Sequence, residues 1–278
     1  MMRQSRHLIV LFILLLLFIA KARAEMLAFR SEAVPTNLTA VIGGELVFPR
    51  GNGPFPVVIL MHPCGGLEPV GLAALQAHAK NLANAGFATY ILDSYGPRNL
   101  GGGKACENFP TGTLRSGDAF NGMVALHNHP KVSKENIFLL GLSDGANAAL
   151  LAAKGGTAGQ FRAVAAYYPD CQRLLGGPSY VHKSPAIVFV GEKDDWTPPA
   201  ECIKSKSRGA VTGAEFDVVS YPEAHHSFDQ QRATMKYKGH TLAYNRDATA
   251  DSRKRVREFF LKHLTADLKT IPPVSGAK

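Results

Sequence analysis

Six short segments made largely of apolar residues limit what this chain can fold into. They occupy residues 57–62, 88–93, 137–141, 163–168, 186–191 and 216–221. The later ones are continuous apolar runs rather than alternating ones, which is typical of strands buried on both faces of a parallel sheet. Helical patterns lie near residues 70–85, 115–128, 145–154, 199–207 and 248–264. This alternation predicts an α/β fold with an open, mostly parallel central sheet and helices on both faces.

The segments around this pattern complete the expected organisation. Residues 38–48 read as a hairpin pair broken by Gly43 and Gly44. One domain is expected over residues 25–264, with no room for a large cap domain, followed by a flexible tail at residues 265–278. The only long irregular stretch, residues 94–117, is rich in glycine and proline. Such loops in compact domains usually serve as lids or binding loops.

The N-terminus has the pattern of a secretory signal peptide. Arg3 and Arg6 precede an uncharged apolar run at residues 8–20, and Ala22 and Ala24 form an A-x-A cleavage site. An uncleaved anchor is the alternative, but the run is short for a membrane span. We therefore expect residues 1–24 to be removed. The mature chain would be secreted or periplasmic, with no stable membrane association.

Much of the basic charge of the chain lies in this predicted leader. The formal net charge is +9, but residues 1–24 hold four basic residues and no acidic one, which leaves +5 for the mature chain. The remaining charge is spread along the sequence. No aromatic residues are interleaved with the basic cluster at residues 253–257, as nucleic-acid binding would favour. No nucleic-acid partner is expected.

Four cysteines lie in the predicted mature chain. An even number of cysteines in an exported protein indicates disulfides. Four cysteines allow three pairings, and the sequence alone does not choose among them. Metal binding is the alternative, but no C-x-x-C or paired-histidine spacing accompanies the cysteines. We expect two disulfides, no metal and no cofactor. The cysteines are Cys64, Cys106, Cys171 and Cys202.

The sharpest local motif is G-x-S-x-G at residues 141–145, centred on Ser143. It follows an apolar strand and precedes a helical pattern, which is the context of a nucleophile elbow. Glycines flank the serine because the turn is strained and bulky neighbours would collide with the adjoining strand and helix. Asp144, the residue after the serine, would supply one backbone N–H to an oxyanion.

A serine nucleophile needs a general base that is itself oriented by an acid. Two acidic candidates, Asp194 and Asp195, follow the strand at residues 186–191, and two histidines, His225 and His226, follow the strand at residues 216–221. Ligands of open α/β sheets bind at this carboxyl edge. The turn after residues 57–62 would provide the second oxyanion N–H, from Cys64, because Pro63 has none.

Together these motifs resemble the dienelactone hydrolase family of the α/β-hydrolase superfamily, from about residue 57 to residue 264. The resemblance implies an α/β-hydrolase fold and hydrolysis of a small-molecule ester. The family pattern G-x-x-D-x-x-x-P selects Asp194, and Y-x-x-A-x-H-x-F selects His226. The resemblance also implies disulfides between Cys64 and Cys106 and between Cys171 and Cys202.

Two positions depart from the family pattern. Dienelactone hydrolase uses a cysteine nucleophile, where this chain has Ser143, and a glutamate before the oxyanion donor, where this chain has Pro63. Both departures favour a serine esterase over a dienelactone substrate. An amidase or peptidase could use the same triad, although peptidases of this fold usually carry an extra domain. A non-catalytic binding protein would be expected to lack a triad member, and none is missing.

Several other residues are candidates for substrate contact. Tyr95 and Trp196 could form a wall of the pocket or pack in the core, and His225 could line the pocket or fill a loop. Arg98 and Arg115 flank residues 94–117 and could bind a substrate carboxylate. Ion pairing with Asp118 or Glu107 is the alternative for these arginines, and we favour it.

Overall fold

The computed structural model describes residues 23–32, 38–106, 111–157, 159–175, 180–207 and 211–269. Apart from its last two residues, the predicted leader lies outside this part of the chain, as do the final residues of the predicted tail. The beginning of that tail forms a short helix, α7 (Ala266–Lys269), whose Leu268 is buried in the core. No helix in the described part is long and apolar enough to cross a bilayer.

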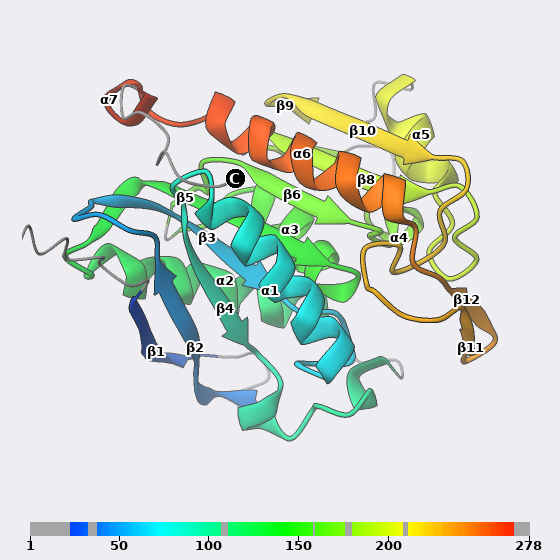
Figure 1. Ribbon diagram of the computed structural model, residues 1–278, viewed down its shortest axis with the longest axis horizontal. Helices are drawn as coiled ribbons and strands as arrows, with labels where there is room; N and C mark the ends of the chain where they lie inside the picture. Colours follow the sequence, from blue (N-terminus) through cyan, green and yellow to red (C-terminus); the bar gives the residue numbers. More distant parts are fainter. Residues whose placement is uncertain are drawn as a thin grey trace, which may run out of the picture.

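An eight-stranded sheet forms the centre of the molecule, in the order β1-β2-β4-β3-β5-β6-β8-β10 (Figure 1). Strands β1 and β2 run antiparallel to their neighbours, and the other pairs are parallel. The predicted α/β fold with a mostly parallel sheet is confirmed. The strands are β1 (Arg23–Ser31), β2 (Ala40–Phe48), β3 (Phe55–Met61), β4 (Ala88–Asp93), β5 (Val132–Leu142), β6 (Val164–Tyr167), β8 (Ala186–Gly191) and β10 (Phe216–Tyr221).

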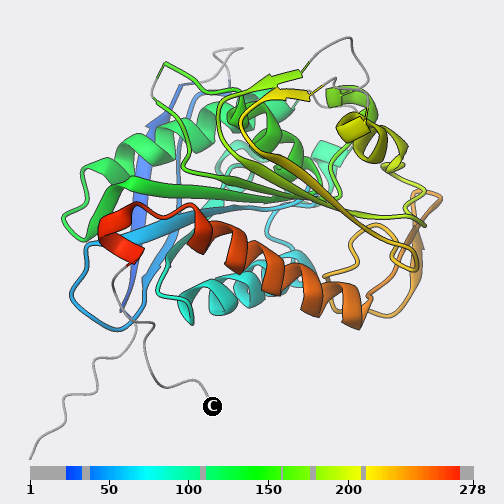
Figure 2. The same cartoon turned by 90° about the horizontal axis from the view of Figure 1, so that it is seen from above.

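Helices cover both faces of this sheet (Figure 2). Helices α2 (Thr111–His127) and α3 (Asp144–Ala153) lie on one face, and α1 (Pro69–Ala83) and α6 (Arg246–Lys262) lie on the other. The chain alternates between two cores along β3: Val57 and Ile59 face the first, and Val58 and Leu60 face the second. Because both faces of β3 are buried, its sequence is apolar throughout.

The hairpin predicted at residues 38–48 is wrong, because β2 is one continuous strand. Gly43 and Gly44 form no turn. A Cβ on Gly43 would lie 2.6 Å from the Leu27 carbonyl oxygen, and one on Gly44 would lie 1.7 Å from that of Ile91. The glycines therefore allow close approach of the neighbouring strands. The partners of β2 are β4 and β1, and β1 is an edge strand that the sequence did not predict.

The described parts of residues 94–117, which are 94–106 and 111–117, contain more regular structure than the sequence predicts. Two 3₁₀ turns, η2 (Gly96–Arg98) and η3 (Lys104–Cys106), lie in this stretch, and α2 begins at Thr111 rather than near residue 115. No large cap domain is present in the described part of the chain.

Short elements complete the fold. The hairpin of β11 (Met235–Tyr237) and β12 (His240–Leu242) lies at the edge toward which the parallel strands point (Figure 1). A small second pair is formed by β7 (Tyr180–His182) and β9 (Val211–Gly213), and the remaining helices are α4 (Cys171–Leu175) and α5 (Ala200–Ser207).

Candidate active site

Ser143 lies at the sharp turn between β5 and α3. Its φ of 54° and ψ of −114° are strained for a residue with a side chain. The two flanking glycines make this turn possible: a Cβ on Gly141 would lie 2.0 Å from the Gly145 carbonyl oxygen, and one on Gly145 would lie 2.4 Å from that of Met61. The motif therefore has the backbone geometry of a nucleophile elbow.

Next to Ser143, a histidine and an aspartate complete a continuous hydrogen-bonded chain. The Ser143 Oγ lies 3.0 Å from His226 Nε2, and His226 Nδ1 lies 2.7 Å from Asp194 Oδ2. His226 follows β10 and Asp194 follows β8, so the carboxyl ends of neighbouring strands bring them together. Both side chains are buried. The carboxylate accepts from Nδ1, which leaves Nε2 free to accept the serine proton.

Thr197, which the sequence analysis missed, fixes the Asp194 carboxylate. The backbone N–H groups of Trp196 and Thr197 donate to Oδ1 at 2.9 and 2.8 Å, and the Thr197 hydroxyl donates to Oδ2 at 2.9 Å. The same hydroxyl lies 3.1 Å from His226 Nδ1. The D-x-x-T spacing at residues 194–197 is the signal that could have identified this turn.

The neighbouring candidates Asp195 and His225 face elsewhere. Asp195 accepts from the backbone N–H of Thr241 at 2.9 Å and lies 3.5 Å from Lys236 Nζ, so it anchors the β11–β12 hairpin. His225 is half-buried and does not line the pocket beside Ser143. The structure thus brings Asp194 and His226 to Ser143, in agreement with the family pattern.

A cavity of about 490 Å³ opens onto Ser143 and His226. Trp196 forms part of its wall, with its ring centroid 5.1 Å from that of His226 and 5.2 Å from that of His240. The hairpin contributes Tyr237 and Leu242 to the same wall. The turn after β3, at residues 63–66, the start of α1 and Cys106 also line the cavity.

The turn after β3 is braced from behind by His62. Its Nδ1–H donates to the Pro63 carbonyl at 2.8 Å, and its Nε2 accepts from the backbone N–H of Ser94 at 3.2 Å. Burial and the nearby Arg115 guanidinium hold the pKa of His62 well below its usual range. The imidazole is therefore neutral, with one defined tautomer.

Four of the five predicted substrate contacts, Tyr95, Arg98, Arg115 and His225, do not line the pocket. Arg115 pairs with Asp144 at 2.9 Å rather than with Asp118, and Glu107 lies outside the described residues. Arg98 is buried in an ion pair with Asp118, with nitrogen-to-oxygen distances of 2.7 and 2.9 Å, so the alternative of ion pairing is the one observed. Tyr95 is fully buried and donates its hydroxyl to Asp144. Both side chains are bonded to protein partners, and only Trp196 of the predicted contacts lines the cavity.

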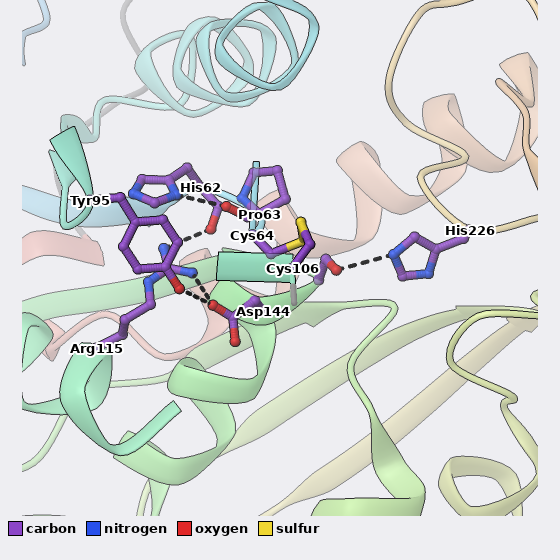
Figure 3. The surroundings of a disulfide bond; sticks show 9 residues. His62, Pro63, Cys64, Tyr95, Cys106, Arg115, Asp144 and His226 are labelled. Atoms are coloured by element: carbon purple, nitrogen blue, oxygen red, sulfur yellow. Dashed lines mark hydrogen bonds and ion pairs between the residues drawn. A yellow bond between two sulfur atoms is a disulfide. The ribbon is translucent and has the colours of Figure 1, made fainter. Parts of the chain in front are cut away.

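Disulfides join Cys64 to Cys106 and Cys171 to Cys202, the pairing that the family resemblance implies. The first links the turn after β3 to η3 across the pocket wall (Figure 3). The second links α4 to α5. Within the described residues, no group of three or more His, Cys, Asp or Glu side chains is arranged to hold a metal ion.

Solved structures with the same fold are numerous. A dienelactone hydrolase-like promiscuous phosphotriesterase from metagenomic libraries has a TM-score of 0.64 and 19% identity, over 88% of this chain and 99% of that one. Dienelactone hydrolase from Anabaena variabilis gives 0.60 and 18%, over 88% and 99%. An esterase from Pyrococcus furiosus gives 0.59 and 16%, over 87% and 92%.

Sequence comparison identifies the family of this chain but no individual relative. No curated protein sequence matches this chain significantly. The model of the dienelactone hydrolase family, in contrast, matches residues 42–264, which include the strained serine, the buried histidine and aspartate, and the turn after β3. The chain belongs to the dienelactone hydrolase family and has the α/β-hydrolase fold.

Proposed function

We propose that this hydrolase cleaves carboxylic esters of small molecules through a Ser143–His226–Asp194 triad and an acyl-enzyme intermediate. The observation that carries the proposal is the unbroken chain from Ser143 Oγ to His226 Nε2, at 3.0 Å, and from His226 Nδ1 to the Asp194 carboxylate, at 2.7 Å. A hydroxyl, an imidazole and a carboxylate in this order are the parts that nucleophilic acyl transfer requires.

The proposed mechanism begins with a proton transfer from Ser143 to His226. Ser143 Oγ attacks the ester carbonyl carbon while its proton moves to His226 Nε2, and Asp194 stabilises the imidazolium that forms. The backbone N–H groups of Cys64 and Asp144 hold the negative oxygen of the tetrahedral intermediate. His226 then protonates the leaving alcohol. Water, deprotonated by His226, attacks the acyl-enzyme and releases the carboxylic acid and free Ser143.

Labelling with a fluorophosphonate, combined with a substrate panel, tests this proposal. The probe is expected to attach to Ser143, as located by peptide mass spectrometry, because it phosphonylates activated serines. Hydrolysis of p-nitrophenyl esters of graded acyl length should exceed that of the matching p-nitroanilides. Faster anilide cleavage would favour an amidase or peptidase. Folded protein that takes no label would favour a binding protein.

We also propose that the enzyme is exported and that cleavage follows Ala24. All cysteines of the chain are paired in the structure, which supports an oxidising compartment. Such a cut removes the first two residues of β1 and leaves the pairing from Glu25 with Leu46 onward. Intact-mass measurement of the protein from the periplasm or medium should give a chain starting at Glu25. A chain retaining Met1 in the membrane fraction would instead indicate an uncleaved anchor.

A further inference from the structure

One arginine outside the triad contacts both segments that carry the proposed oxyanion donors. Arg115, on α2, is fully buried. Its Nη1 donates to Asp144 Oδ2 at 2.9 Å, and its Nη2 donates to the carbonyl oxygen of His62 at 2.6 Å. Figure 3 shows the guanidinium beneath the turn that holds Cys64, with these interactions drawn as dashed lines.

The two acceptors follow neighbouring strands, β3 and β5, which pair in parallel up to Met61 and Gly141 and so bring both segments to the site. Asp144 directly follows the nucleophile and begins α3. His62 directly follows β3, two residues before Cys64. The guanidinium is planar, and its N–H groups are fixed relative to one another. Beyond the last paired residues of β3 and β5, a single rigid group therefore bridges the Asp144 side chain and the His62 carbonyl of the turn after β3.

Tyr95 strengthens this arrangement. Its hydroxyl donates to the same oxygen of Asp144, and its ring lies under the guanidinium, 4.7 Å from ring centroid to the Arg115 Cζ. The ring also contacts that of His62 at 4.7 Å between centroids. The Asp144 carboxylate is thus bound by Arg115 and Tyr95, which fixes the first residue of α3.

Stability alone does not account for this cluster. A buried ion pair loses much of its attraction to the cost of removing both charges from water, and well-packed apolar residues often replace such pairs without loss of stability. A buried Arg–Asp pair that bridges two catalytic segments, however, fixes their relative position. Preorganised oxyanion donors depend on such fixation, because small displacements weaken hydrogen bonds formed in the transition state.

We propose that Arg115 is a positioning residue of the oxyanion hole, which holds the Asp144 and Cys64 backbone N–H groups at their working separation through Asp144 and the His62 carbonyl. The inference rests on the proposed ester hydrolysis. Arg115 is not proposed as a substrate ligand, because both of its terminal nitrogens donate to protein acceptors.

The test compares single and double variants. Arg115→Gln and Asp144→Asn each leave one buried charge without its partner, so both should lower the midpoint of chemical unfolding. The double variant R115Q/D144N removes both charges and should regain most of that midpoint. With p-nitrophenyl acetate, we expect kcat to fall by about 100-fold in all three proteins, with KM within about threefold of the parent value.

A pH profile separates this effect from damage to the triad. Because Arg115 does not contact His226, the pH midpoint of kcat/KM should stay at the parent value in the variants while the plateau falls. The rate of fluorophosphonate labelling should fall together with kcat. If the double variant regains kcat along with its unfolding midpoint, or if the pH midpoint moves, the proposed role is wrong.

Asp118→Asn is the matched control. Asp118 is also the buried partner of a buried arginine, Arg98; its hydrogen bonds go to Arg98 and Ser31, and it acts on Arg115 only through its charge. This variant should lose stability as Asp144→Asn does and keep kcat within about threefold of the parent value. An equal loss of kcat in Asp118→Asn would show a general effect of buried charge and overturn the inference.

The outcome for the parent enzyme distinguishes the two proposals. If the parent protein neither hydrolyses esters nor takes the fluorophosphonate, the proposed function fails and this inference fails with it. If the parent protein is active and R115Q/D144N keeps its kcat, only the positioning role is refuted.

Discussion

Ser143→Ala is expected to reduce the kcat for p-nitrophenyl acetate by roughly a million-fold, to the level left by binding and the oxyanion donors alone. Alanine removes the Oγ that lies 3.0 Å from His226 Nε2, and no other hydroxyl is held at that nitrogen in the described part of the chain. The backbone strain at φ 54° is the same for alanine as for serine, so the fold should survive.

The measurement pairs a kinetic assay with an unfolding curve. An unfolding midpoint equal to that of the parent protein, together with lost turnover and lost fluorophosphonate labelling, would support Ser143 as the nucleophile. Turnover retained in the variant would mean that another group attacks the ester. The Cys64 sulfur is not an alternative nucleophile in the oxidised protein, because it is bonded to Cys106.

Asp194→Asn is expected to lower kcat by about 10⁴-fold, the loss known for the same change in the serine protease triad. The asparagine amide would place a donor opposite His226 Nδ1, which would then act as an acceptor and leave the proton on Nε2. Nε2 could no longer take the Ser143 proton. KM should change little, because Asp194 lies behind the histidine and not on the wall of the cavity.

Asp195→Asn is the matched control for this prediction. Asp195 is the adjacent carboxylate, half-exposed, and bonded to the β11–β12 hairpin rather than to His226. Its variant should lose at most about tenfold in kcat, through a looser hairpin. A greater loss in Asp195→Asn than in Asp194→Asn would mean that the acid has been assigned to the wrong residue.

The parts of the fold that the sequence predicts well are those fixed by local pattern. The bounds of β4, β8 and β10 agree with the predicted segments because each is a compact run of strand-forming residues ended by a turn. The same pattern places Ser143, Asp194 and His226 at strand ends. Since parallel strands share one carboxyl edge, three residues far apart in sequence could be expected to meet there.

The parts that the sequence does not predict depend on contacts between distant segments. Strand β1 lacks a strong apolar pattern because it lies at the sheet edge, where alternate side chains remain exposed. Arg98 and Arg115 look alike in sequence, as basic residues near a glycine-rich stretch. Only the packing of α2 shows that one pairs with Asp118 and the other with Asp144.

The Cys64–Cys106 disulfide has a practical consequence for anyone who prepares this enzyme. Both cysteines belong to the pocket wall, so protein made in a reducing cytoplasm and protein made under oxidising conditions share a sequence but differ in the covalent structure of that wall. Specific activities from the two sources are comparable only after the free thiols have been titrated. The redox state of Cys64 and Cys106 therefore has to be known for each sample whose activity is compared.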